Sequence, residues 1–210
     1  MSDTNRILGL TLGTSSLVAL GYLGWWWWVR KDTIDIDIIP DTHEEQDITN
    51  SETHWNFAAN APVPEDWNIR HFSPEDLKSR GNNRVVANKQ ALRALDRAAH
   101  RAQQYGHPPI RLTNQVRSDR NGAYRDPIWN ARQGGASNSR HMFGDGFDIW
   151  TQDHNASERL QLLKNLYAAG FRGYGHGVAN IHVDTGKKRR WRYGKASIPQ
   201  WNTFDGSQAV

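Results

Sequence analysis

The pattern of hydrophobic and polar positions predicts two long helices. Between residues 88 and 105, and again over 157–169, hydrophobic side chains recur at the spacing of one helix face. Gly106 and Gly170 follow these segments directly, and glycine is common where helices end. The inward-facing positions are Leu92, Leu95, Ala99 and Ala102 in the first helix and Leu160, Leu163 and Tyr167 in the second.

A shorter helix and three strands complete the expected elements. Ser73-Pro74-Glu75-Asp76 has the hydroxyl, proline and acid of a helix start. Ile110, Leu112 and Val116 alternate along a predicted strand, and Phe147–Thr151 and Ile181–Asp184 are two further candidates. Helices separated from a few strands indicate an α+β fold with a small antiparallel sheet and flanking helices.

The N-terminal 30 residues differ from the rest of the chain. Residues 7–29 carry no charged side chain. A helix of that length reaches roughly 35 Å, enough for a bilayer core of about 30 Å. Trp25–Trp28 at its end suit a membrane interface. We therefore expect a transmembrane signal-anchor over residues 1–30, with a cleaved signal peptide as the alternative.

Charge divides the remainder into a linker and a domain. Residues 31–66 hold ten acidic residues and one basic residue, and we expect a largely disordered linker there, with Ile34–Ile38 as a possible edge strand. From residue 67 to 195, 23 Lys and Arg face 10 Asp and Glu. This predicts a basic domain over 67–195 and a tail over 196–210. Such a domain suits a polyanionic partner, either nucleic acid or an anionic cell wall.

The absence of cysteine restricts any metal site to His, Asp and Glu ligands. His141 and Asp148 lie seven residues apart, with Gly144 and Gly146 between them to allow a tight turn. His182 lies on a predicted strand and would supply a third ligand. By spacing alone, ordinary polar loop residues remain an alternative for all of these positions.

Together these motifs resemble the zinc D-Ala-D-Ala carboxypeptidase family. Ser139, His141, Gly144 and Asp148 match its SxHxxGxxxD signature. The order of the other elements also agrees, over roughly residues 67–193: they are His71–Leu77, Val116-Arg117-Ser118, Gly134-Gly135-Ala136, Ile181–Gly186 and Trp191.

The resemblance implies a fold like that of DD-peptidases and hedgehog proteins, and a role for each matching residue. His141, Asp148 and His182 would bind Zn²⁺. Arg117 would hold the carboxylate or the carbonyl oxygen of the substrate, and Ser139 would bind substrate near the metal. The expected activity is hydrolysis of D-amino-acid peptide bonds in peptidoglycan, by a domain on the periplasmic or cell-wall side of the inner membrane. A phage lysis enzyme fits the same pattern.

One position departs from the family pattern. Several members carry an acid or histidine three residues before the last zinc ligand as the general base, and here that residue is Ala179. His176, on what we expect to be the glycine-rich loop 173–177, and Asp184 are the candidates to replace it as catalytic groups. Asp184 could instead orient His182.

Two other functions remain open at this point. Without a base, the domain would be a catalytically silent zinc-containing module that binds peptidoglycan. The basic run Lys187–Arg192 could instead grip the phosphates of a nucleic acid. Neither the choice between carboxypeptidase and endopeptidase nor the oligomeric state follows from the sequence.

Overall fold

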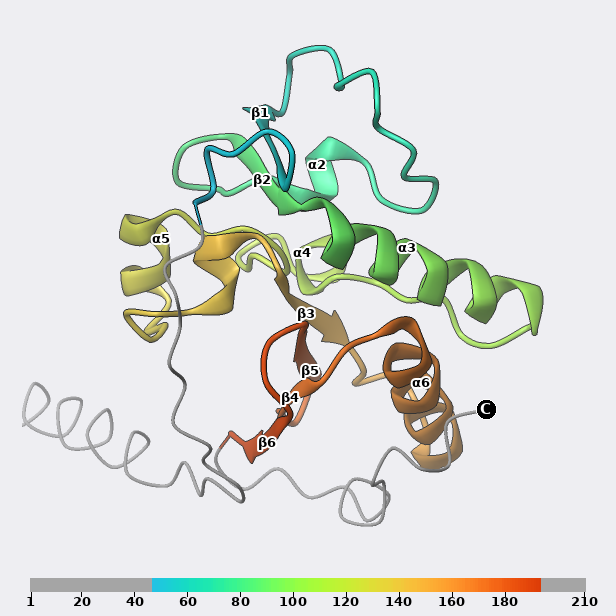
Figure 1. Cartoon of the computed structure of the whole chain (residues 1–210). Coiled ribbons are helices and arrows are strands. Elements are labelled where there is room, and N and C mark those ends of the chain that lie inside the picture. The colour runs from blue at the N-terminus through green and yellow to red at the C-terminus, as the bar shows by residue number, and fades with distance from the viewer. Residues whose placement is uncertain (1–46, 194–210) are drawn as a thin grey trace, which may run out of the picture. The chain divides into compact units, whose positions relative to one another are not determined.

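The computed structural model describes residues 47–193, which form a two-stranded and a four-stranded sheet with helices around them (Figure 1). The predicted anchor, the edge strand at 34–38 and the tail at 196–210 lie outside the described residues. Within 47–193, no helix combines the length and the apolar character that a membrane span requires.

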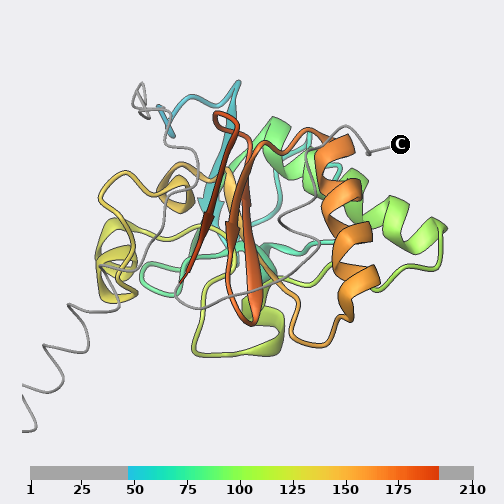
Figure 2. The same ribbon diagram turned by 90° about the horizontal axis from the view of Figure 1, so that it is seen from below.

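The two long helices follow the prediction closely. Helix α3 is Lys89–Gln104, and the Asn88 side chain caps it by accepting from the backbone N–H of Ala91. Helix α6 is Ala156–Ala169, and Gly170 ends it with a φ of 118°. The helices contact each other and lie together on one side of the strands (Figures 1 and 2). Their apolar faces therefore share one core.

The four-stranded sheet has the order β3-β5-β4-β6, with bounds Gly146–Trp150 for β3, Asn180–Asp184 for β5, Gly173–His176 for β4 and Arg189–Arg192 for β6. The pairs β3–β5 and β5–β4 are antiparallel, which agrees with the expected small antiparallel sheet, although β4 was expected to be a loop. Strand β6 runs parallel to β4 and was not expected. The sheet is therefore mixed at one edge.

The two faces of this sheet differ in chemistry because side chains alternate along each strand. Phe147, Ile149, Ile181 and Val183 point to one face, are at most 1% exposed, and belong to the core cluster that includes α3 and α6. The residues between them, on the other face, are mostly polar. We call these the core face and the polar face.

The predicted linker extended too far toward the C-terminus. His54–Ala58 forms strand β1, which pairs antiparallel with β2, Arg84–Asn88. Trp55, the second residue of β1, is 2% exposed and donates its indole N–H to Asp66. The acidic composition of this stretch therefore conceals a buried strand, and the folded part begins before Trp67.

The short helices connect these parts, and one replaces a predicted strand. Pro74–Leu77 forms α2 with the expected capping box. Thr113–Val116 forms the single turn α4, so the strand predicted through Val116 is wrong beyond Leu112, which makes one bridge to β3. The Gln115 side chain accepts from Leu112 N–H and so stabilises the turn. Pro127–Arg132 forms α5, and Arg140–Phe143 forms a 3₁₀ helix, η1.

Candidate metal centre

Three predicted ligands meet on the polar face of the sheet. His141 comes from η1, Asp148 from β3 and His182 from β5, where Asp148 and His182 are direct cross-strand partners. Gly144 ends η1 with a φ of 69°, a conformation that favours glycine, and so turns the chain from His141 into β3. The ligand atoms of the three residues lie within 4.8 Å of one another.

The spacing of these atoms suits one tetrahedral ion. His182 Nδ1 is 3.1 Å from His141 Nε2 and 3.0 Å from Asp148 Oδ1, and the last two atoms are 3.3 Å apart. Zinc bonds of about 2.0–2.1 Å with tetrahedral angles put neighbouring ligand atoms about 3.3 Å apart. Two imidazoles and one carboxylate, with a fourth position left for water or substrate, are a typical catalytic zinc set. The residues therefore fit zinc.

Hydrogen bonds on the far nitrogens fix which atom of each histidine faces the ion. His141 Nδ1 donates to the carbonyl oxygen of Ala123 at 2.7 Å, which leaves Nε2 for the metal. His182 Nε2 donates to Asp184 Oδ2 at 3.2 Å, which leaves Nδ1. Such partners orient the ring and make the imidazole a better ligand. Asp184 therefore has the orienting position that its spacing from His182 allowed.

Asp184 is itself held from two sides. Its carboxylate is fully buried and accepts from the Arg189 guanidinium at 2.7 Å and from Gly186 N–H at 2.8 Å. A Cβ at Gly173 would lie 2.5 Å from both carboxylate oxygens, so this glycine leaves the space that Asp184 occupies. Strand β6 thus contributes to the metal centre through Arg189. This also gives one cation of the basic run an internal partner.

Residues 121–125 surround the ligands and were missed from the sequence. The carbonyl oxygen of Gly122 accepts from Asp148 N–H at 2.7 Å. The Arg125 guanidinium donates to Asp148 Oδ2 and to the carbonyl oxygen of Asn121. The family pattern to which we assigned Val116-Arg117-Ser118 reads Tyr-Arg-Ser and precedes the Gly-Gly-Ala element. Tyr124-Arg125 also precedes Gly134-Gly135 and has the tyrosine that position 116 lacks. That tyrosine was the available signal.

The protonation states favour metal binding at neutral pH. Burial lowers the pKa of His141 to about 4, and Arg125 acts in the same direction. Burial acts to raise the pKa of Asp148, but His141 and Arg125 lower it well below 3.8. Burial acts to lower the pKa of His182, but its hydrogen bonds to Asp148 and Asp184 raise it above 6.5. Without a metal, His182 is therefore the ligand that retains a proton most strongly.

The predicted glycine-rich loop is in fact strand β4. Gly173 and Gly175 face the polar side, opposite Asp184 and His182, and a Cβ at Gly175 would lie 2.3 Å from the Trp191 ring. His176 is fully buried and pairs with Ile181, so its side chain lies on the core face, away from His182. Burial, with Arg159 and Arg192, lowers its pKa to about 4. This placement does not favour His176 as the general base.

The other two predicted site residues lie at the periphery. Arg117 is exposed and its guanidinium pairs with Asp119 at 3.1 Å. Ser139 precedes η1 as its N-cap without a side-chain hydrogen bond to the helix, and it is partly exposed two residues before His141. The structure thus brings Ser139, through η1, near the ligands and puts Arg125 rather than Arg117 against Asp148.

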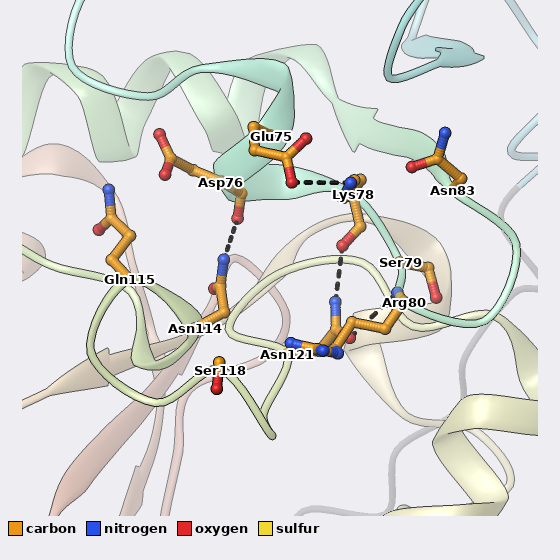
Figure 3. A pocket seen from close by; sticks show the side chains of 10 residues that line it. All are labelled: Glu75, Asp76, Lys78, Ser79, Arg80, Asn83, Asn114, Gln115, Ser118 and Asn121. Carbon is orange, nitrogen blue, oxygen red and sulfur yellow. Dashed lines mark hydrogen bonds and ion pairs between the residues drawn. The ribbon is translucent and has the colours of Figure 1, made fainter.

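A polar pocket is lined by Asn121, which precedes Arg125 by four residues (Figure 3). It has a volume of about 390 Å³ between α2 and the chain at 114–121. Asn121 connects pocket and metal centre, because its side chain lines the pocket and donates to Lys78 O while its own carbonyl oxygen accepts from Arg125. The lining residues are Glu75, Asp76, Lys78, Ser79, Arg80, Asn83, Asn114, Gln115, Ser118 and Asn121.

A comparison with protein families agrees with this geometry. A family model described as Peptidase M15 matches residues 70–184, more than half of the 210-residue chain. The match includes all three ligands and Asp184, and it ends before β6. No match was found among curated proteins.

Proposed function

Because the chain belongs to the peptidase M15 family, we propose that it is a zinc peptidase that hydrolyses D-amino-acid peptide bonds in peptidoglycan. The observation that carries this proposal is the convergence of His141, Asp148 and His182 with ligand atoms 3.0–3.3 Å apart. Zinc, when bound there, would lower the pKa of a coordinated water and polarise the carbonyl group of the substrate.

The side chains around the ligands prepare the site for this chemistry. Asp184 and Ala123 O keep the two imidazoles in the tautomers that face the ion. Arg125 keeps Asp148 ionised and adds positive charge beside it. Because developing negative charge in a water-poor site is stabilised by such fixed charges, Arg125 takes the role that the resemblance assigned to Arg117.

Peptidoglycan as the substrate is supported by the family and by charge. The domain from residue 67 to 195 carries 23 basic and 10 acidic residues, and peptide stems of the wall are rich in carboxylates. The pocket beside Asn121 adds a polar site of about 390 Å³ for a further part of such a substrate.

The test is to incubate the zinc-loaded full chain with purified sacculi and to identify the soluble products. Free D-alanine would indicate a carboxypeptidase, and release of uncrosslinked peptides an endopeptidase. His141→Ala serves as the metal-site control, and His100→Ala, which alters an exposed histidine, as the matched surface control. If the unmodified chain releases no more product than His141→Ala, the enzymatic proposal is wrong.

A zinc-containing binding module is the second candidate. It is favoured by Ala179, which stands where a general base is expected and whose carbonyl oxygen accepts from Thr151 N–H. Such a module would pellet with sacculi in the presence of zinc and be released by a chelator, without product. The same incubation therefore separates the two candidates.

A membrane tether with the domain on the cell-wall side belongs to the same proposal. Its support is the uncharged run at residues 7–29 and the four tryptophans that end it. In fractionated cells, the full chain should stay with the inner membrane after an alkaline wash, and a chain that lacks residues 1–30 should not.

A further inference from the structure

Strand β6 and the residue that follows it bring two aromatic side chains, Trp191 and Tyr193, to the face that holds the metal ligands. Trp191 pairs with Gly175, which in turn pairs with His182, so these three positions lie on the polar face. Tyr193 follows Trp191 by two residues. Its N–H donates to the carbonyl oxygen of His176 at 2.7 Å, which extends the pairing of β6 with β4 to this residue. The Tyr193 side chain therefore points to the same face as His182.

The aromatic rings form a series from a ligand to the surface. The His182 and Trp191 ring centroids are 5.4 Å apart, and those of Trp191 and Tyr193 are 6.0 Å apart with the planes at 78°. His182 is 5% exposed, whereas Tyr193 is 42% exposed. Tyr193 is thus the exposed end of this series, and its edge-on contact with Trp191 holds the ring in place.

The environment of the Tyr193 hydroxyl determines its protonation state. Burial of the hydroxyl raises its pKa, and the negative charge of Asp148 raises it further, while Trp191 and Arg125 act in the opposite direction. The phenol therefore keeps its proton at neutral pH and is available as a hydrogen-bond donor.

None of Asp184, Ala179 and Arg125 supplies a hydroxyl donor. Asp184 is occupied by His182, Arg189 and Gly186, and Ala179 has no polar side chain. Arg125 donates to Asp148 and to Asn121 O. Tyr193 carries a hydroxyl group on the polar face, in a partly exposed side chain that contacts Trp191.

We propose that Tyr193 contacts the substrate, its hydroxyl donating a hydrogen bond to the carbonyl oxygen of the peptide bond that is cut. The inference rests on the proposed function. The hydrogen bond strengthens as that oxygen gains negative charge, so Tyr193 stabilises the transition state more than the bound substrate. The family match, which ends at residue 184, does not include this residue.

The test compares Tyr193→Phe, which removes only the hydroxyl, with Tyr105→Phe, a change at a 65% exposed tyrosine that ends α3. Three quantities are measured on the full chain: kcat and KM on sacculi, the zinc content, and the affinity of the zinc-loaded protein for acetohydroxamate. This small zinc-binding probe carries its own oxygen anion and needs no peptide specificity. Its affinity is measured by calorimetry and does not depend on turnover.

For Tyr193→Phe we expect a fall in kcat of about 10- to 100-fold, a KM within about threefold, unchanged zinc content and about fivefold weaker acetohydroxamate binding. Tyr105→Phe should match the unmodified chain in every quantity. A Tyr193→Phe variant with kcat and probe affinity within twofold of the unmodified chain overturns the inference, and so does loss of zinc, which would show a structural role.

Failure of the proposed function gives a different result. If the unmodified chain binds zinc but releases nothing from sacculi, the proposed function fails, and acetohydroxamate binding alone then tests the role of Tyr193. Weaker binding to Tyr193→Phe then supports the contact with a metal-bound oxygen anion, and equal binding overturns it.

Discussion

The two faces of the four-stranded sheet contrast in what a substitution should change. The core face presents Phe147, Ile149, Ile181 and Val183 to the core that contains α3 and α6, so its side chains contribute mainly to the free energy of unfolding. The polar face presents ligands that hydrogen-bond to one another and to a surrounding set of charged groups. Neighbours in one strand, such as Ile181 and His182, thus support the fold and the chemistry separately.

The largest effect is expected on the polar face. His182→Ala removes one of three ligands and should lower activity on sacculi at least about 1000-fold, because the remaining pair no longer holds the ion in a catalytic geometry. Above the folded pKa of His182, where the stabilisation from its protonated form is absent, the metal-free variant should unfold at nearly the same urea concentration as the metal-free unmodified chain. Zinc analysis and urea titration followed by circular dichroism check both statements. A large loss of metal-free stability would contradict the separation of the two faces.

Substitution of Ile181, which is adjacent to His182, should lower stability and leave zinc binding intact. Ile181 is fully buried, and Ile181→Ala leaves a cavity in the core that should cost about 3 kcal/mol of unfolding free energy. At a temperature where the variant is still folded, it should bind one zinc per chain. Val178→Ala, at a 71% exposed position nearby in sequence, is the control and should change stability by less than about 0.5 kcal/mol. Zinc loss by folded Ile181→Ala would show that the faces are coupled.

A smaller effect is expected from the group that holds Asp184. Arg189→Ala removes the 2.7 Å hydrogen bond to the Asp184 carboxylate and should weaken zinc binding about 10- to 100-fold. Lys188→Ala changes an exposed cation in the same segment and should have no effect on zinc affinity. Competition with a chromogenic chelator measures both. Equal affinities would mean that Asp184 orients His182 without help from β6.

The smallest effect concerns pH. Since zinc must displace the proton of His182, whose pKa is raised, zinc affinity should fall about tenfold per unit as the pH drops below that pKa. In the metal-free protein, the stabilisation from protonated His182 is present below pH 6.5 and is lost as the pH rises through its folded pKa. His141 acts oppositely, because its lowered pKa removes stability as the pH falls from 6.5 toward about 4. Chelator competition between pH 8 and pH 6 tests the first statement, and a pH-independent affinity would contradict it.

The parts of the fold that sequence could predict depend on local signals. Each long helix has its own local signals: α3 has the Asn88 cap and α6 has Gly170 at its end, and each has hydrophobic residues at helical spacing. Both long helices could therefore be predicted. Strand β1 was missed because its partner β2 begins 26 residues after β1 ends, and pairing over that distance leaves no local pattern. The turn at α4 depends on one side-chain contact, Gln115 to Leu112 N–H, that the hydrophobic alternation does not indicate.

The site shows the same division. His141, Asp148 and His182 could be predicted from a motif, and the structure brings them together. Arg125 was missed because Arg117 was assigned to its place in the pattern. Tyr124 was a sequence signal for Arg125, and the contact with Asp148 distinguishes the two arginines in the structure. The contribution of β6 could not be predicted, because parallel pairing with β4 brings Arg189 and Trp191 beside residues far from them in the motif.

The two glycines of β4 have a consequence for how related sequences can vary. Gly175 has no side chain of its own at the centre, yet the Trp191 ring occupies the volume that any side chain there would need. A relative with a larger residue at this position must therefore have lost or moved the indole, and the same exchange should connect position 173 with position 184. Covariation between small and large residues at these two pairs would reveal the pairing of β4 with its neighbours in sequences without a structure.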